Sequence, residues 1–232
     1  MRALLSLSNA LSAVTDLVGR LAAWLFLPLA LVILYDVVQR KLLTVYPEFQ
    51  QSALYDFLPS TKAQELEWHL HGFLFMLCLG FTYIRNGHVR VEIFRDRFSK
   101  RTRAWIELLG CLLFVLPYTL LVADLSATLL VWPAYEINES SSATTGLPLR
   151  WIIKASVVMG FGFLALAALS IALRQLVFLF GPEELRPLAD RYVKDDEIET
   201  LKHEAEAELA RDAAWHPEHH FSGDGPPRGG RE

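Results

Sequence analysis

The sequence has little of what enzymes and disulfide-bonded domains usually carry. It contains two cysteines among 232 residues, Cys78 and Cys111, and both lie inside apolar stretches without CxxC spacing. That pattern excludes a disulfide framework and a cysteine-rich metal site, and it is typical of packing residues. The sequence also lacks a P-loop, a nucleophile elbow and a zinc-binding signature. It therefore predicts no catalytic residue, no metal site and no cofactor.

Histidine is scarce where a membrane haem would need it. His69 and His71 open one apolar block and His88 follows it, while the other long apolar blocks contain no histidine. Residues two apart point to different faces of a helix, so His69 and His71 cannot form one ligand face. A transmembrane haem needs facing pairs on two helices, and the sequence does not supply them. Haem binding is therefore not expected.

What the sequence does contain is four long apolar blocks. Hydrophobic residues make up 53% of the chain and concentrate at about 21–43, 66–84, 104–131 and 151–180. A bilayer core of about 30 Å needs roughly 20 helical residues to cross it. Since backbone polar groups in lipid must be satisfied within the segment, each block is predicted to be a helix. The predicted fold is an all-α integral membrane protein with four transmembrane helices, within a membrane domain over 21–181.

Residues 1–20 show a different pattern from the blocks that follow. Their apolar residues fall at helical spacing, with Ser, Asn, Thr and Asp between them: Leu4, Leu7, Leu11, Val14 and Val18. This spacing predicts an interfacial amphipathic helix that leads into the first span. The first apolar block is too long, and begins too late, for a cleavable signal peptide.

The basic residues predict the orientation in the membrane. The segment between the second and third spans contains Arg85, Arg90, Arg95, Arg97, Lys100, Arg101 and Arg103. The segment between the third and fourth spans has only Arg150. Lysine and arginine favour the cytoplasmic side, so the basic loop and both termini are predicted to be cytoplasmic.

Residues 182–232 are predicted to form an acidic cytoplasmic tail. They hold 14 acidic residues against 7 Lys or Arg. Ile198, Leu201, Ala205 and Leu209 fall at helical spacing, which predicts a short amphipathic helix. The final stretch, GDGPPRGGRE, is typical of disorder.

Ionisable residues inside the spans lie mostly near span ends, where snorkelling to the interface is cheap. Asp124 is the exception, because it is the deepest charge in the predicted spans and follows Pro117, a predicted kink point. Transporters with their own solute site usually show paired broken helices and mid-membrane polar residues. Neither these nor an inverted repeat is evident, so the chain is not expected to bind the transported solute alone.

The stretch GHVRVEIFRDRF combines basic and aromatic residues, which resembles a nucleic-acid patch. Its place between two spans instead predicts a membrane-surface elbow, with no nucleic acid as partner. Its cytoplasmic-interface residues are His88, Arg90, Glu92, Arg95, Arg97 and Arg101. The basic ones are expected to meet anionic lipid head groups. An interfacial helix or turn is favoured over a strand, which would leave backbone groups unpaired.

Three separated motifs resemble one known family. They are GHVRVEIFRDRFSKRTRAWIELLG, YPEFQ…LEWHLHGFLFMLCLGFTY and GLPLRWIIKA. Together they resemble the small membrane subunit, DctQ type, of tripartite ATP-independent periplasmic (TRAP) transporters, in the longer form of the mannitol/chloroaromatic-compound branch. The resemblance covers roughly residues 15–180. Glu92 stands where the family usually has aspartate, and the tail after Gly181 carries no family motif.

The resemblance implies a sodium-coupled uptake system for an organic acid, a carboxylate or 2-oxo acid, in the inner membrane of bacteria or archaea. A periplasmic binding protein captures the solute, and a large membrane subunit carries the sodium and substrate sites. The small subunit is then a non-catalytic scaffold that braces the large one. Two alternatives stay open: a membrane anchor subunit of a redox complex, and a membrane-tethered signalling or scaffold protein that uses the acidic tail.

Candidate residues for such a scaffold lie near the predicted periplasmic side. Arg40 and Glu67 are expected at similar depth, where a pair between them would fix the first hairpin. Glu136, Arg150 and Lys154 are expected at the periplasmic surface, where they would meet the large subunit or the binding protein.

Overall fold

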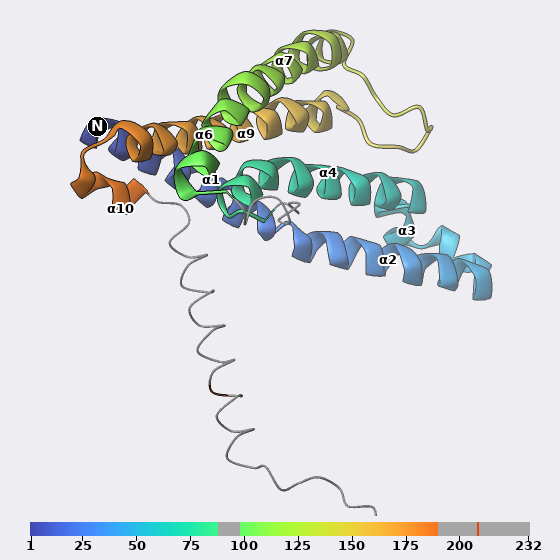
Figure 1. The fold of residues 1–232 in the computed structure, drawn as a ribbon. Helices are drawn as coiled ribbons and strands as arrows, with labels where there is room; N and C mark the ends of the chain where they lie inside the picture. The colour runs from blue at the N-terminus through green and yellow to red at the C-terminus, as the bar shows by residue number, and fades with distance from the viewer. Residues whose placement is uncertain (88–97, 190–207, 209–232) are drawn as a thin grey trace, which may run out of the picture. The chain divides into compact units, whose positions relative to one another are not determined.

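The computed structural model describes residues 1–87, 98–189 and 208, and every regular element in these ranges is helical. Figure 1 shows the arrangement. The longer helices are α1 (Arg2–Ala23), α2 (Phe26–Val45), α4 (Ser60–Ile84), α6 (Lys100–Gly110), α7 (Leu116–Ser126) and α9 (Trp151–Phe180). The shorter ones are η1 (Pro47–Gln51), α3 (Ala53–Phe57), η2 (Cys111–Val115), η3 (Ala127–Val131), α8 (Trp132–Glu136), η4 (Glu183–Leu185) and α10 (Arg186–Ala189). The all-helical prediction is confirmed for these residues.

Three helical stretches among the described residues are long and apolar enough to cross a membrane: Arg2–Val45, Lys100–Glu136 and Trp151–Phe180. The helix α4, which contains the predicted second span, is not one of them. Its first half carries Glu65, Glu67, His69 and His71, which lower its mean hydropathy. A chain with membrane-spanning helices is therefore supported, while the second span, in α4, and with it the total of four, stays a prediction.

A proline separates α1 from α2. Pro28 has no backbone N–H, so the carbonyl of Trp24 loses its usual donor four residues later. The chain tightens there instead: Leu25 N–H donates to Ala22 O at 2.9 Å, and Leu27 N–H donates to Trp24 O at 3.2 Å. The α-helical hydrogen bonding is thus interrupted inside the predicted first span; α1 packs against α4 and α9, and α2 packs against α4.

Two further prolines widen the helix between α6 and α8. Leu116 N–H donates to Cys111 O, five residues back, directly before Pro117. Trp132 N–H donates to Ala127 O in the same way, directly before Pro133. A proline ring clashes with the carbonyl four residues earlier, and a π-helical turn is one way to relieve that clash. The predicted kink point at Pro117 thus coincides with the end of the π-helical turn η2.

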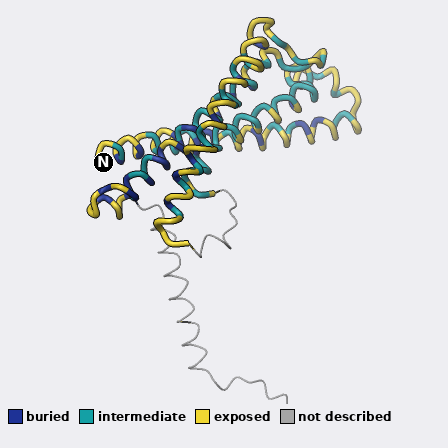
Figure 2. Tube along the Cα trace, turned by 45° about the horizontal axis from the view of Figure 1, so that its top comes forward, coloured by how far each residue is buried: buried dark blue, intermediate teal, exposed yellow. Residues whose placement is uncertain are grey.

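The helix α9 packs against α1, α4, α6 and α7. In Figure 2 the buried, dark blue segments gather where the long helices lie side by side. Two glycines allow α4 and α9 to approach closely. A Cβ built on Gly160 would lie 2.7 Å from the Met76 carbonyl oxygen, and one built on Gly80 would lie 2.6 Å from the Phe163 carbonyl oxygen. Such small residues let helix backbones meet in membrane proteins.

The helix α1 buries its small and polar residues. Its buried residues are Leu5, Ser8, Thr15, Gly19 and Ala22. The predicted apolar face is only partly covered: Leu7 is 48% exposed and Val14 is 49% exposed, whereas Leu4, Leu11 and Val18 are half-buried. The interfacial location of this helix stays a prediction, and in the structure the polar face of α1 packs against α4 and α9. Contacts distant in sequence contribute to this packing, because Ser8 and Ser12 both bond to Ser170 of α9.

The two cysteines are free thiols. Cys111 is 1% exposed and belongs to an apolar cluster with Ala104, Leu108 and Ile171, where α6 meets α9. Tyr83 Oη lies 3.3 Å from Cys111 Sγ. Packing thus accounts for Cys111.

The chain divides into two units, Met1–Asp190 and Arg191–Glu232. The helices and contacts described below belong to the first. The predicted tail helix at 198–209, apart from Glu208, and residues 88–97 of the loop motif lie outside the described residues.

Candidate functional site

A buried carboxylate ties α2 to the start of α4. Asp36 is 1% exposed. Ser60 Oγ donates to its Oδ1 at 2.7 Å, and Arg40 forms an ion pair with its Oδ2. Nearby, Tyr35 Oη and Gln39 Nε2 donate to the carbonyl of Leu58, at 3.0 and 3.2 Å. These contacts satisfy the carboxylate and fix the first hairpin.

Arg40 therefore has a different partner from the predicted one. It pairs with Asp36, one turn earlier on the same helix, rather than with Glu67. The i, i+4 geometry brings the two side chains together without bending either helix, and Ser60 holds Asp36 in place. Glu67 lies close enough to interact electrostatically with Arg40, but its buried Oε1 has no hydrogen-bond partner among the described residues.

Glu65 anchors the segment between α8 and α9 to the side of α4. Its Oε2 accepts a hydrogen bond from Leu147 N–H at 2.5 Å, and its Oε1 accepts one from Ser141 Oγ. Burial alone would raise the pKa of Glu65. The hydrogen bonds from Ser141 and Leu147, with the charge of Arg150, hold that pKa below its ordinary value. The ionised carboxylate is thus the form that this loop contact favours.

Two of the predicted surface cations also serve this loop. Lys154 forms an ion pair with Glu139, and Arg150 N–H donates to Glu139 O at 2.9 Å. The Arg150 guanidinium carbon lies 5.7 Å from the centre of the Trp68 ring, within cation–π range. Arg150 and Lys154 are thus engaged inside the chain, whereas Glu136 is exposed.

Sequence reasoning missed Glu65 and Glu139. A loop that returns to a helix 76 or more residues earlier leaves no local spacing signal. The only hint was Glu65 itself, a carboxylate at the edge of an apolar block.

A second polar cluster lies at the opposite end of α4. Asp16 bonds to Arg85 and to Arg20, each with a shortest distance of 2.6 Å. Asn9 Oδ1 accepts from Arg174 at 2.6 Å, farther along α1. These contacts join α1 to α4 and α9.

The same end contains a contact between α6 and α9. Gln175 Nε2 donates to Glu107 Oε2 at 2.6 Å. Glu107 and Arg174 are two of the charged residues that the sequence places near span ends, and the structure shows that each joins two helices. Which side of a membrane they face stays a prediction.

Five residues of the cytoplasmic-interface motif lie outside the described residues: His88, Arg90, Glu92, Arg95 and Arg97. Arg101, the sixth, is exposed in the first turn of α6. Ser99 begins that helix, since its Oγ accepts from Thr102 N–H at 3.3 Å.

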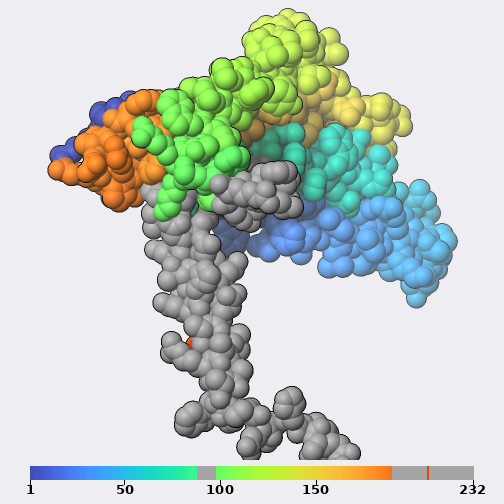
Figure 3. All heavy atoms as spheres, viewed as in Figure 1, coloured from blue at the N-terminus to red at the C-terminus, as the bar shows by residue number. Residues whose placement is uncertain are grey.

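Asp124 lies on the exposed side of α7, among exposed leucines. Thr128 Oγ1 donates to the backbone carbonyl of Asp124 at 2.9 Å, not to its carboxylate. Among the residues that the structure describes, this carboxylate has no ion-pair or hydrogen-bond partner. In Figure 3 the green atoms of α6 and α7 form part of the outer surface of the viewed face.

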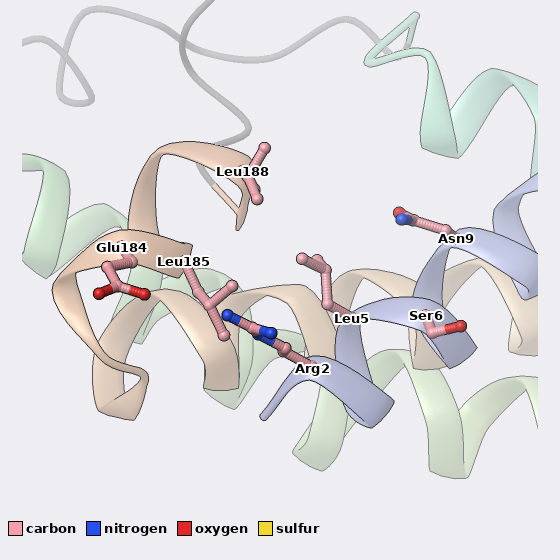
Figure 4. A pocket seen from close by; sticks show the side chains of 7 residues that line it. All are labelled: Arg2, Leu5, Ser6, Asn9, Glu184, Leu185 and Leu188. Carbon is pink, nitrogen blue, oxygen red and sulfur yellow. The ribbon is translucent and has the colours of Figure 1, made fainter.

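Shallow hollows lie at three separate places on the described part of the chain. One of about 470 Å³ lies beside the start of α1 and is lined by Arg2, Leu5, Ser6, Asn9, Glu184, Leu185 and Leu188, as Figure 4 shows. Another, of about 420 Å³, lies between the start of α4 and the loop at Gly146. The third, of about 450 Å³, is almost wholly apolar and lies between Tyr83, Tyr118 and Leu164. Within the described ranges, no group of three or more His, Cys, Asp or Glu is placed to hold a metal ion.

These contacts alone do not show to which family the chain belongs, but a comparison with family models does. The model for the DctQ component of tripartite ATP-independent periplasmic transporters matches residues 29–178. The chain belongs to the DctQ family. No curated protein and no solved structure matches it.

Membership makes this chain a small component of a TRAP transporter, in a family that is generally non-enzymatic. It is a membrane protein with helices able to span a bilayer. The matched range begins in α2 and ends near the end of α9, so it includes Asp36, Glu65, Asp124 and Lys154. It leaves out α1 and the acidic tail. The contacts of α1 with α4 and α9 therefore involve a helix outside the matched range.

Proposed function

We propose that this DctQ chain is the small, non-catalytic scaffold subunit of a sodium-coupled TRAP transporter that imports an organic acid. The observation that carries the proposal is that the polar groups and the apolar faces of the chain differ in how far they are satisfied within it. The buried polar groups near the two ends of α4 mostly bond within the chain, whereas leucine-rich faces stay uncovered. On α2 the exposed side includes Phe26 at 61%, Leu31 at 67% and Leu34 at 60%. A rigid bundle with open apolar faces suits a subunit that braces a larger one.

The charge positions support four spans, with α4 as the second. No Asp, Glu, Lys or Arg occurs within 21–35, 68–84 or 155–173. At 1.5 Å per residue these helical segments are roughly 22–28 Å long, close to the hydrocarbon thickness once the flanking charges snorkel. The basic C-terminal end of α4 is then cytoplasmic, and both termini are cytoplasmic too. The inner membrane is the corresponding location.

The basic loop is the lipid-facing part of this proposal. His88, Arg90, Glu92, Arg95, Arg97 and Arg101 lie between the second and third spans in the sequence. Each basic residue there gains about 1 kcal/mol from anionic lipid head groups. The loop thereby holds the cytoplasmic ends of the spans at the membrane surface.

The periplasmic partner surface lies at the other end of the spans. This surface consists of exposed Glu136 and of the loop between α8 and α9, whose conformation Glu65, Arg150 and Lys154 hold. This surface meets the large membrane subunit or the periplasmic binding protein, the two partners that the family implies. Because Arg150 and Lys154 bond within the chain, their role is to shape this surface.

The solute follows from the family resemblance alone. An organic acid, as a carboxylate or 2-oxo acid, fits the mannitol/chloroaromatic branch, and its binding sites belong to the partners. Nothing among the described residues or in the family match favours the redox-anchor alternative. The His69 ring, for example, bonds to the Glu65 carbonyl of its own helix.

Reconstitution tests the proposal. The chain is co-expressed with its large membrane subunit, purified through a tag on the small chain, and placed in liposomes with the binding protein. The expected result is co-purification and sodium-driven uptake that requires all three proteins. Uptake at the full rate without the small chain, or failure to retain the large subunit, would overturn the proposal.

A further inference from the structure

We infer that the Asp124 face of α7 is the contact surface for a transmembrane helix of the large membrane subunit, and that this helix carries a basic side chain opposite Asp124. The inference rests on the proposed function and names one interface of it. The face is defined by Leu113, Pro117, Leu120, Leu121, Asp124 and Thr128, which all lie on the exposed side of the helix.

The first step is the isolation of the charge. Between Glu107 and Glu136, Asp124 is the only Asp, Glu, Lys or Arg in the sequence. Leu120 is 59% exposed and Leu121 is 57% exposed, so the surroundings of the carboxylate on this face are hydrocarbon. Asp124 lies far from both of these charges: roughly 26 Å of helix separates it from Glu107 and roughly 18 Å from Glu136.

The second step is the free-energy cost of an unpaired carboxylate on a lipid-facing helix surface. A charged residue on a lipid-facing surface near mid-membrane is costly, and intramembrane carboxylates almost always face a protein or a water-filled cavity and pair with another group. The other charged side chains near the ends of the spans already show this behaviour. Asp36 pairs with Arg40, Asp16 with Arg85, and Lys154 with Glu139.

The third step is the absence of a partner for the carboxylate among the described residues of the chain. Thr128, the nearest polar residue one turn along, donates its hydroxyl to the backbone carbonyls of Asp124 and Leu125. Within the described residues the carboxylate itself is left without a donor. The missing group must come from outside, and charge complementarity makes it a basic one on an otherwise apolar helix.

The same geometry argues against a purely structural role. Asp124 holds no two helices together, unlike Asp36 or Glu107. Removing its charge should therefore leave the isolated chain as stable as before, or more stable, while weakening the complex. A second copy of this chain would place two carboxylates against each other, which like-charge repulsion disfavours.

The test compares Asp124→Leu, Asp124→Asn and the control Asp56→Asn, which neutralises an exposed carboxylate in α3. Each variant is co-expressed with the large membrane subunit, and the fraction of large subunit retained by the tagged chain is measured in detergent. Asp124→Leu should lower the apparent affinity at least tenfold, and Asp124→Asn severalfold. The control should retain the large subunit as wild type does. The thermal unfolding midpoint of isolated Asp124→Leu should not fall.

A photo-crosslinking residue in place of Leu121 identifies the neighbour directly. An adduct with the large subunit supports the inference, whereas an adduct only with a second copy of the chain or with lipid overturns it. Wild-type retention by Asp124→Asn excludes a basic partner, and wild-type retention by Asp124→Leu excludes this face. In both cases wild-type co-purification leaves the proposed function standing. If the wild-type chain retains no large subunit, both fail.

Discussion

The helix α9 and the stretch from α6 to α8 have equal mean hydropathy, but α9 is much more buried in the helix bundle. In its most apolar window α9 has 44% of its residues buried, while the stretch Lys100–Glu136 has 17%. The difference follows from side-chain size. Buried residues of α9 include Ser156, Gly160, Ala167 and Ala168, whereas the other stretch carries mainly leucine outward. Hydropathy thus assigns both helices to the membrane, and small residues select the one at the centre of the bundle.

The largest effect should come from filling the glycine contact at the centre. Gly160→Leu places side-chain atoms where Met76 backbone already lies, since a Cβ would be 2.7 Å from its carbonyl oxygen. Neither backbone can yield without moving a helix, so a loss of about 3 kcal/mol or more is expected, at or above the upper range for overpacking. Thermal unfolding of the purified chain in detergent measures it.

The matched control lies two residues away on the same helix. A Cβ built on Gly162 meets nothing within 4 Å. Gly162→Leu should therefore leave the unfolding midpoint nearly unchanged. Equal losses for the two variants would contradict close packing of Gly160 against α4 as the cause, since leucine has the higher helix propensity and would not by itself destabilise the helix.

A second pair of substitutions compares the two helices directly. Ile171 of α9 is 4% exposed, and Leu129 in η3 is 68% exposed. Ile171→Ala leaves a cavity against α6 and should cost about 2 kcal/mol, the low end for such truncations because lipid offers the unfolded helices an equally apolar surrounding. Leu129→Ala should change the stability of the isolated chain by less than about 0.5 kcal/mol. Comparable losses at both positions would show that the α6–α8 stretch is packed as tightly as α9.

The Glu65 anchor should matter less, because it fixes a loop. Glu65→Ala removes the acceptor for Leu147 N–H and Ser141 Oγ, and should cost about 1 kcal/mol. The loop should then be cut faster by protease, which limited proteolysis followed by mass spectrometry would show. Exposed Glu136→Gln is the control, and its loop should be cut at the wild-type rate.

The pH dependence of this contact has a defined sign. Because the folded-state pKa of Glu65 lies below the ordinary value of 4.5, its contribution is present above about pH 4.5 and is lost as pH falls through the lower folded value. The difference in cleavage rate between wild type and Glu65→Ala should therefore be constant from pH 5 to pH 7 and shrink below that. A difference that instead grows on acidification contradicts the ionised anchor.

The smallest expected effect is at the serine cluster between α1 and α9. Ser170 Oγ donates to Ser8 O at 2.8 Å and lies 2.6 Å from Ser12 Oγ. Side-chain hydrogen bonds between membrane helices contribute about 0.6 kcal/mol on average, so Ser170→Ala should lower stability by about that amount. Ser142→Ala, at an exposed position in the loop, should have no effect. A loss of several kcal/mol on thermal unfolding would instead make this cluster a main determinant of α1 packing.

Much of the fold was accessible from the sequence. The helical character follows from apolar blocks longer than a soluble strand, and three stretches keep enough hydropathy to span a membrane. The family follows from three local motifs, and the match over 29–178 confirms it. Arg40 was predicted to pair with Glu67, and in the structure it forms its ion pair with Asp36 while Glu67 interacts with it electrostatically. Similar depth in a membrane does not distinguish Glu67 from a residue one helical turn away.

Local patterns determined this protein up to the level of single helices. Periodicity, hydropathy and the positions of Pro28, Pro117 and Pro133 specify where helices run and where they break, because these effects act within a few residues of the backbone. Tertiary structure alone decided the neighbours: which face of α1 is buried, which loop Glu65 holds, and that Asp124 has no donor within the described chain. Those outcomes depend on side chains brought together across as many as 165 residues, a separation at which spacing in the sequence carries no geometric information.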